Sequence, residues 1–151
     1  MALGANLGRC AETFNSVIAE LDQQVAEVRA VSRYFISPAL VPEKAPAQPD
    51  YLNAVLLCRS LLAAHDLLKQ LLQIERRFGR DRSTQQRWQP RTIDLDIISY
   101  GDFMCNQADL ILPHPEMHKR RFVLEPLCDI APNWKHPILG HSALELLSNL
   151  S

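Results

Sequence analysis

The amino-acid sequence predicts an α+β fold: an antiparallel sheet with helices packed on it and a helical C-terminal extension. Four short segments are rich in β-branched, aromatic or clustered apolar residues, and two segments repeat apolar residues at helical spacing. Their order along the chain, β-α-β-β-α-β, is the ferredoxin-like, split β-α-β pattern. The length of 151 residues, with 47% hydrophobic and 22% charged residues, predicts one domain over residues 1–151.

The first half of this pattern begins with a short apolar segment at residues 1–3, which ends in the turn signal Gly-Ala-Asn-Leu-Gly at 4–8. Residues 9–24 carry apolar side chains at helical spacing and predict a helix. Residues 25–35 predict the next strand because they are rich in β-branched and aromatic residues.

Prolines mark the middle of the chain. Residues 37–49 contain four of them and predict a long loop without regular structure. Residues 51–59 predict a further strand. Residues 63–78 predict a helix that ends at Gly79, because leucines share one face and glycine commonly stops a helix.

The last half begins with a polar, basic loop at residues 80–91, followed by a strand predicted at 92–100. A turn at 101–102 leads to a short extended piece, and the rest is predicted to be helical. The predicted segments are residues 103–105 (extended), 113–130 (helical pieces) and 142–149 (a last short helix). The loops at 37–49 and 80–91 are longer than simple connections require, which is typical of functional loops.

Composition excludes several classes of protein. The net charge of −1 gives no generally basic surface for nucleic acid, and no apolar run is long enough to span a membrane. The four cysteines form no C-x-x-C pair, so a zinc ribbon or thioredoxin-type site is excluded. Glycines and an asparagine interrupt residues 1–11 where an export signal would be apolar, so a cytoplasmic protein with reduced thiols is expected.

Asp94 and Asp96 form the most informative pair of residues. They lie two apart on a predicted strand, so both side chains point to one face while the isoleucine and leucine neighbours point to the other. Two like charges side by side repel unless a positive group lies between them. Mg²⁺ binds one or two carboxylates together with substrate phosphates. The pair therefore favours a magnesium site, with a solvated strand face as the alternative.

Arginines are concentrated just before this strand. Residues 75–91 contain six arginines and two acidic residues, a charge of +4 in a chain whose net charge is −1. A second basic cluster at 119–121 follows His114. Guanidinium groups match phosphate oxygens in a two-pronged geometry, so these clusters beside the aspartates predict a site for a nucleotide with bound Mg²⁺. For any single arginine, a solvated helix end is the alternative.

Two further observations concern the ligand. The phosphate-binding motifs G-x-x-x-x-G-K-[ST] and G-x-G-x-x-G are both absent, so nucleotide binding would have to rely on side chains. Tyr51 and Asn53 lie on one face of their predicted strand, and an aromatic ring beside an amide suits a flat heterocycle that forms hydrogen bonds.

Taken together, these segments resemble the 6-hydroxymethyl-7,8-dihydropterin pyrophosphokinase family. The P-R-x-x-D-x-D motif before an apolar pair is highly specific, and the resemblance runs through nearly the whole chain. The segments that carry it are residues 3–8 (LGANLG), 49–54 (PDYLNA), 74–80 (IERRFGR), 87–96 (RWQPRTIDLD) and 113–124 (PHPEMHKRRFVL).

The resemblance implies transfer of the terminal diphosphate of ATP to 6-hydroxymethyl-7,8-dihydropterin, with AMP as the other product, in folate biosynthesis. It implies two Mg²⁺ ions bound by Asp94 and Asp96. The implied catalytic residues are Arg82, Arg91, Asp94 and Asp96. The implied ATP-binding residues are Glu75, Arg80, Arg82, Arg91, Ile97, His114 and Arg120. The implied pterin-binding residues are Ser37, Pro38, Tyr51, Asn53, Trp88 and Phe122.

The resemblance further implies a cytoplasmic monomer whose partners are ATP and the dihydropterin, without nucleic acid or membrane. Two other interpretations remain. One is an RNA-binding module, since ferredoxin-like sheets can carry RNA. It would require exposed aromatic residues on the sheet, whereas only 7% of the residues are aromatic. The other is an inactive relative that acts as a partner protein.

Overall fold

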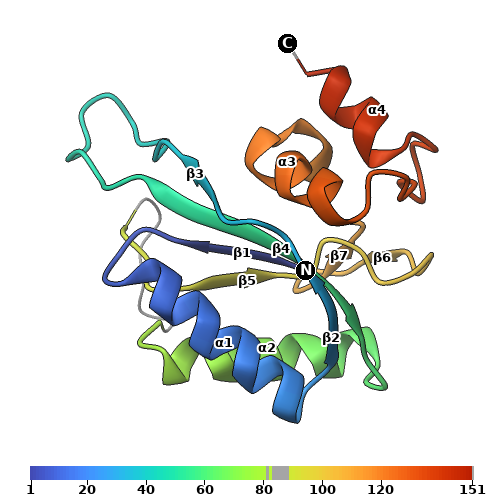
Figure 1. Ribbon diagram of the computed structural model, residues 1–151, viewed down its shortest axis with the longest axis horizontal. Helices are drawn as coiled ribbons and strands as arrows, with labels where there is room; N and C mark the ends of the chain where they lie inside the picture. The colour runs from blue at the N-terminus through green and yellow to red at the C-terminus, as the bar shows by residue number, and fades with distance from the viewer. Residues whose placement is uncertain (81, 83–88, 151) are drawn as a thin grey trace.

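The computed structural model describes residues 1–80, 82 and 89–150. It confirms the predicted α+β class, with an antiparallel sheet, helices packed on it and further helices at the C-terminus (Figure 1). The strand order is β2-β4-β1-β5, which is the split β-α-β arrangement. β1 (Ala2–Ala5) is central, between β4 (Tyr51–Arg59) and β5 (Asp94–Asp96), and β2 (Glu27–Val31) lies outside β4.

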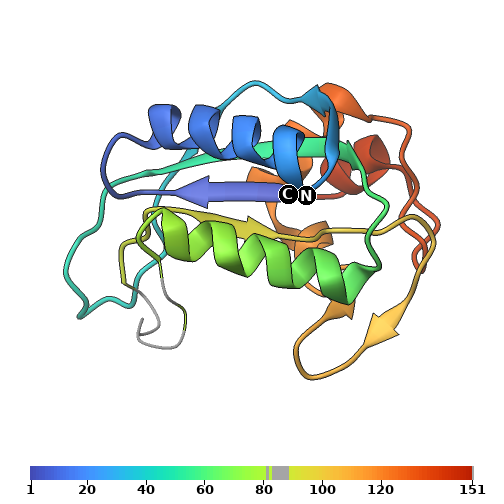
Figure 2. The same cartoon turned by 90° about the horizontal axis from the view of Figure 1, so that it is seen from below.

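Helices pack on both faces of the sheet (Figures 1 and 2). The first face carries α1 (Cys10–Gln24) and α2 (Ala64–Arg77), and α3 (Arg121–Ile130) packs on β4 from the other side. This explains the consecutive burial along β4, where residues 53–56 are all buried although a one-sided strand would alternate. The last helix, α4 (Ala143–Ser148), packs on α3.

Two clusters of buried apolar residues follow from these layers. The larger one lies between the sheet and α1 and α2, and includes Phe14, Leu71 and Leu95, each at most 1% exposed. The smaller one lies under α3 and α4. Its buried members are Val55, Ile98, Met117, Val123, Leu124, Leu127, Ala143 and Leu146. Neighbouring residues of β4 enter different clusters, because side chains alternate across a strand.

The prediction of a single strand at residues 25–35 is wrong, because the structure has two strands in this region. β2 is followed by β3 (Phe35–Ser37), and both pair with β4. Ser32 separates them. Its Oγ accepts a hydrogen bond from Val55 N at 2.9 Å, and its N donates to Val55 O at 3.0 Å. The Ser32 hydroxyl thus takes the place of a backbone carbonyl as the acceptor for Val55 N. Residue propensities do not predict such a contact.

The strand predicted at 92–100 is also shorter than expected. β5 contains three residues because its partner β1 offers three positions, from Ala2 opposite Asp96 to Gly4 opposite Asp94. Beyond it, Ile98 O accepts from His114 N at 2.8 Å. The extended piece predicted at 103–105 is displaced to β6 (Cys105–Asn106), which pairs with β7 (Ile111–Leu112).

The other predicted elements are confirmed to within a residue or two. Gly79, with φ of 91°, follows α2 as expected, and a capping box between Ser142 and Glu145 starts α4. The helical pieces predicted at 113–130 are a short 3₁₀ helix (Met117–Lys119) and α3. Within the loop predicted at 37–49, residues 38–49 contain no helix or strand, as predicted, whereas Ser37 is the last residue of β3. None of the helices in the described residues has the length and apolar character needed to cross a membrane.

Candidate active site

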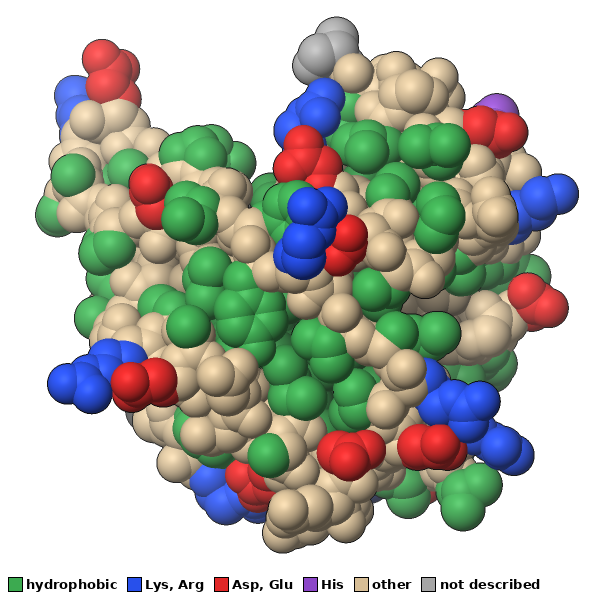
Figure 3. Space-filling view, in the orientation of Figure 1, with side chains coloured by type: hydrophobic (Ala, Val, Ile, Leu, Met, Phe, Trp, Pro, Cys, Tyr) green, Lys and Arg blue, Asp and Glu red, His purple; other side chains and the backbone are tan. Residues whose placement is uncertain are grey.

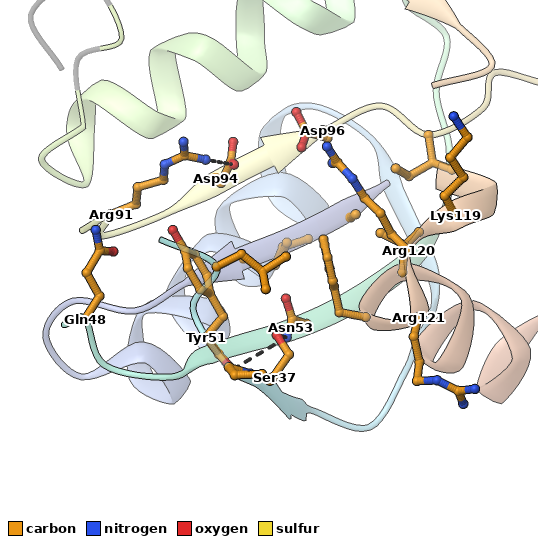
Figure 4. A pocket seen from close by; sticks show the side chains of 18 residues that line it. Ser37, Gln48, Tyr51, Asn53, Arg91, Asp94, Asp96, Lys119, Arg120 and Arg121 are labelled. Carbon is orange, nitrogen blue, oxygen red and sulfur yellow. Dashed lines mark hydrogen bonds and ion pairs between the residues drawn. The ribbon is translucent and has the colours of Figure 1, made fainter. Parts of the chain in front are cut away.

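A cavity of about 520 Å³ opens between the start of α3 and the sheet face that β3, β4, β1 and β5 share. The surface is hollowed between these two parts of the molecule (Figure 3), and the cavity brings together residues from distant segments (Figure 4). The predicted site residues that line it are Ser37, Pro38, Tyr51, Asn53, Arg91, Asp94, Asp96, Arg120 and Phe122. It therefore collects predicted phosphate, metal and pterin residues in one place.

Asp94 and Asp96 project into the cavity from the same face of β5, as their spacing predicted. Leu95 between them is 1% exposed and lies in the core. Its burial holds the strand in a register that keeps both carboxylates on the cavity side.

Three arginines surround the Asp94 carboxylate. Arg80 Nη1 lies 2.6 Å and Arg82 Nη2 lies 2.9 Å from Oδ1, and Arg91 Nη1 lies 2.8 Å from Oδ2. Burial opposes ionisation of this group, but the three guanidinium groups outweigh it and lower the pKa of Asp94 below its usual value. Asp94 is therefore held as a carboxylate, already surrounded by groups that bind anions.

Asp96 has a different environment. Its side chain is 33% exposed, and the nearest guanidinium atom, Arg82 Nη2, is 3.6 Å away. Burial, together with the charge of Asp94, raises the pKa of Asp96 to about 6. The side chain of Arg120 reaches toward it from the start of α3 (Figure 4). Asp96 is thus the carboxylate of the pair with fewer and more distant positive groups, and it would gain most from a cation.

Glu75 and Arg82 together complete the outer edge of β5. Glu75, on α2 and 1% exposed, accepts from Leu95 N at 2.7 Å, and Arg82 Nη2 donates to Leu95 O at 3.3 Å. The two side chains bind each other through a pair of hydrogen bonds of 2.7 and 2.8 Å. They therefore satisfy the peptide groups that a further strand would otherwise bind, and they keep the backbone between the two aspartates fixed.

Arg91 stands at the entrance to β5 with its side chain 27% exposed. Its Nε is buried, and the described residues offer it no hydrogen-bond partner. A buried donor without a partner is costly, so this atom favours an additional acceptor such as a phosphate oxygen.

Tyr51 and Asn53 form the opposite, neutral part of the cavity wall. Asn53 Nδ2 donates to Ser37 Oγ at 2.8 Å and to Phe35 O at 3.2 Å, so β3 fixes the orientation of the amide. Gly4 lies opposite Asn53 in the sheet, and a Cβ there would lie 3.8 Å from the Tyr51 ring. The absence of a side chain at Gly4 leaves space beside the ring, as a flat ligand requires.

Arg120 connects the charged and neutral walls. Its guanidinium carbon lies 5.7 Å from the centre of the Phe122 ring, a cation–π distance, while its side chain extends toward Asp96. Arg121 points away from the cavity and pairs with Glu125 at 2.9 Å. Adjacent arginines therefore have different surroundings, which composition alone could not distinguish.

Several residues that the resemblance implied for ATP lie outside the cavity lining. Glu75, Arg80 and Arg82 form the layer behind Asp94, and Ile97 is 6% exposed within the core. His114 is partly buried beyond β5, where burial and the charge of Arg120 lower its pKa. Trp88, implied for the pterin, lies outside the described residues.

The cavity also contains Gln48, to which sequence reasoning gave no role, and Lys119, which belongs to the basic cluster predicted at 119–121. Gln48 lies at the end of the proline-rich loop, and Lys119 precedes the arginine pair. The position of Gln48 next to the segment 49–54 was the available signal, since a residue preceding a binding strand commonly borders its site.

The carboxylate oxygens of the cavity fit a magnesium ion that takes its other ligands from a bound substrate. Among the described residues, no group of three or more His, Cys, Asp or Glu side chains could hold a metal ion alone. Asp94 and Asp96 supply carboxylate oxygens only, and Mg²⁺ commonly takes its remaining ligands from phosphates and water. The site thus has the composition expected for a metal that arrives with a nucleotide.

Comparison with known proteins is consistent with this geometry. The family described as 7,8-dihydro-6-hydroxymethylpterin-pyrophosphokinase (HPPK) matches residues 1–132. The chain is 41% identical over 151 residues to the 2-amino-4-hydroxy-6-hydroxymethyldihydropteridine pyrophosphokinase of Synechocystis sp., covering 99% of this chain and 74% of that protein. It is also 41% identical over 152 residues to the protein of the same name from Pseudomonas aeruginosa, covering 98% and 88%.

Longer relatives contain the same region as one part. The chain is 36% identical over 150 residues to the folic acid synthesis protein FOL1 of Dictyostelium discoideum, covering 99% of this chain and 22% of that protein. It is 32% identical over 146 residues to the folate synthesis bifunctional protein of Chlamydia trachomatis, covering 94% and 32%.

Proposed function

The chain belongs to the 7,8-dihydro-6-hydroxymethylpterin-pyrophosphokinase family, and we infer from this membership that it transfers a diphosphate group from ATP to 6-hydroxymethyl-7,8-dihydropterin in folate biosynthesis. The observation that carries the inference is the single cavity with two dissimilar walls. One wall holds Asp94, Asp96 and Arg91, and the other holds Tyr51 and Asn53. Such a site suits a triphosphate on one side and a flat, hydrogen-bonding heterocycle on the other.

We propose that the charged wall positions ATP. The family uses ATP with Mg²⁺, and Asp94 and Asp96 would hold two of these ions. When bound, the ions would neutralise part of the negative charge on the phosphates. Arg91 and Arg120 line this wall and bind phosphate oxygens, Arg91 as a catalytic residue. Arg82, the second proposed catalytic arginine, and Arg80 act from the layer behind Asp94, and His114 acts from beyond β5. Glu75 and Ile97 contribute indirectly, because they hold β5 in place: Glu75 binds the Leu95 backbone from α2, and Ile97 packs in the core.

The neutral wall positions the acceptor. Asn53 binds the heterocycle edge, while the rings of Tyr51 and Phe122 pack against its faces, and Ser37 and Pro38 border it. Trp88, which is not among the described residues, is also proposed to bind the pterin. The hydroxyl oxygen of the dihydropterin attacks the β-phosphorus of ATP directly, since diphosphate transfer depends on positioning and charge neutralisation more than on covalent catalysis. The bond from this phosphorus to the oxygen shared with the α-phosphate breaks, AMP leaves with that oxygen, and the hydroxyl proton passes to water.

A direct assay tests the function. AMP should form from ATP and Mg²⁺ only when the dihydropterin is present, in equal amounts with the pterin diphosphate. ATP consumption without a requirement for the dihydropterin would contradict the acceptor assignment. Absence of AMP under all conditions would favour the inactive partner protein. The RNA-binding alternative requires exposed aromatic residues on an open sheet face. Helix α3 packs on part of that face, and the cavity on the remainder contains only Tyr51 and Phe122 as aromatic residues among those described.

We propose further that residues 1–151 act as one domain and as a monomer, because the cavity is built from segments of one chain. A cytoplasmic location is also proposed. All four cysteines are free, as expected in a reducing compartment.

A further inference from the structure

Asn6 lies where three segments of the cavity wall meet, and the function proposed for the cavity leaves it without a role. It follows directly after β1, whose last pairs are Gly4 with Asp94 and Ala5 with Leu52. Because β1 is antiparallel to both neighbours, β4 and β5 both begin beside its end. The connections that lead into these strands, residues 38–50 and the segment ending at 93, therefore both arrive at Asn6.

The Asn6 side chain uses its amide to bind both connections. Nδ2 donates to Gln48 Oε1 at 3.0 Å and to Pro49 O at 3.2 Å. Oδ1 accepts from Arg91 N at 2.8 Å, and the backbone N of Asn6 donates to Arg91 O at 3.0 Å. The residue is 2% exposed, so water cannot easily replace these partners.

The partners determine which way the amide is turned. Pro49 O can only accept a hydrogen bond and Arg91 N can only donate one, so Nδ2 must face the first and Oδ1 the second. Two donors and an acceptor on so short a side chain are specific to asparagine. Aspartate has no donor when ionised, serine has one, and glutamine is longer by a methylene group.

Each connection carries a part of the cavity. Residues 38–50 begin at Pro38 on the neutral wall and return to the cavity through Gln48. Arg91 lines the charged wall and donates to Asp94 at 2.8 Å. Asn6 thus binds Arg91 of the charged wall and Gln48 of the loop that begins on the neutral wall, and it does so without lining the cavity itself.

We propose that Asn6 is a positioning residue that sets the placement of the pterin wall relative to the phosphate wall. The proposal rests on the proposed function, because it concerns the two substrates assigned to those walls. Transfer requires the acceptor hydroxyl and the phosphorus to meet within a narrow range of distance and angle. A residue that holds both walls should therefore affect turnover although it contacts neither substrate.

Two variants test separately the hydrogen bonds that Asn6 forms with Gln48 and Pro49 and the one that it accepts from Arg91 N. Asn6→Asp keeps the acceptor for Arg91 N and loses both donors to Gln48 and Pro49. We expect the KM for the dihydropterin to rise ~10-fold, the effect of about one hydrogen bond, while the KM for ATP and kcat stay close to wild type. Asn6→Leu keeps the branched shape and the number of side-chain heavy atoms but loses the side-chain hydrogen bonds to both connections, while the backbone hydrogen bond to Arg91 O remains. We expect it to lower kcat by ~10-fold or more as well.

A matched control and a double-mutant cycle distinguish positioning from general destabilisation. Asn15→Ala removes an asparagine that also forms a tertiary hydrogen bond, to Tyr34 at 2.6 Å, away from the cavity. It should leave all kinetic constants unchanged. Gln48→Leu should raise the dihydropterin KM in the wild type but add little in the Asn6→Asp background, because both changes break the same contact.

The outcomes are separable. Wild-type kinetic constants in Asn6→Leu, or equal effects of Asn6→Asp on both substrates, would overturn the positioning role while the proposed function stands. If Asn6→Leu fails to fold, additive effects of Asn6→Asp and Gln48→Leu would overturn it instead. A wild-type protein that forms no AMP from ATP and the dihydropterin would overturn the proposed function, and this role with it.

Discussion

The two walls of the cavity are held together by different physical forces. On the charged wall, the carboxylate of Asp94 contacts three guanidinium groups within 2.9 Å, and a buried Glu75 fixes the layer behind it. On the neutral wall, Asn53 is oriented by hydrogen bonds to Ser37 and Phe35, and its position follows from strand pairing. One wall depends on charge and the other on sheet register.

This difference determines what a substitution should do. Removal of one member of a buried ionic cluster leaves other charges uncompensated, which costs more than the loss of a single neutral hydrogen bond. Within the charged wall, Asp94 is fully compensated and Asp96 is not. Changes on the charged wall should therefore act mainly on kcat, and changes on the neutral wall mainly on pterin binding.

The largest effect is expected for the two aspartates. Asp94→Ala and Asp96→Ala should each lower kcat by ~10²-fold or more, since each removes a group that organises charge at the reacting phosphates. Steady-state assays with saturating Mg²⁺ measure this loss, and calorimetry should show that pterin binding is retained. Asp102→Ala, an exposed aspartate in a distant turn, is the control. Normal turnover by Asp96→Ala would refute the metal assignment.

The second largest effect on kcat is expected for Arg91. Arg91→Ala should lower kcat by ~10- to 100-fold with a smaller change in pterin affinity, because its guanidinium faces the phosphates and Asp94. Arg91→Lys should not restore activity, since an ammonium cannot provide two parallel donors. Stopped assays and separate binding measurements for the two substrates give the comparison. Complete rescue by lysine would mean that charge alone matters on this wall.

A smaller and different effect is expected on the neutral wall. Asn53→Ala should raise the KM for the dihydropterin ~10-fold, as expected for loss of about one hydrogen bond, with little change in kcat or in the KM for ATP. Asn106→Ala, on the separate β6–β7 hairpin, is the matched control. A kcat defect at saturating pterin would show that the two walls do not act separately.

The smallest expected effect is on stability. The pKa of Asp96 is about 6 in the folded protein and 3.8 in the unfolded chain, so unfolding releases a proton between these values and stability falls as pH rises through them. Asp96→Asn without Mg²⁺ should therefore raise the Tm at pH 7 by ~3 °C, with no difference at pH 4. Thermal unfolding at both pH values measures this. A lower Tm at pH 7 would mean that Asp96 is already compensated in the free protein.

Local patterns in the sequence were sufficient for both long helices, for the strand at 51–59 and for the pair of aspartates. The spacing of Asp94 and Asp96 placed both on one face because side chains alternate along any strand. The leucine repeat and Gly79 defined α2 almost to the residue, since both signals act within a few residues of one another. The resemblance to a known family then joined segments that periodicity could not connect.

Tertiary structure decided which distant groups meet. Ser32 interrupts the strand predicted at 25–35 because its hydroxyl finds Val55 on a strand that begins 19 positions later, at Tyr51. The length of β5 depends on how far β1 extends beside it.

The sequence by itself therefore determined that Asp94 and Asp96 share one face of their strand and that Tyr51 and Asn53 share one face of theirs, because side-chain direction is a property of the local backbone. Only the folded chain decided that Asn6 would bind the two connections and that Glu75 would bind the backbone between the aspartates. The physical reason is that a buried polar group must find partners wherever packing brings them, and those partners are 20 to 85 positions away along the chain.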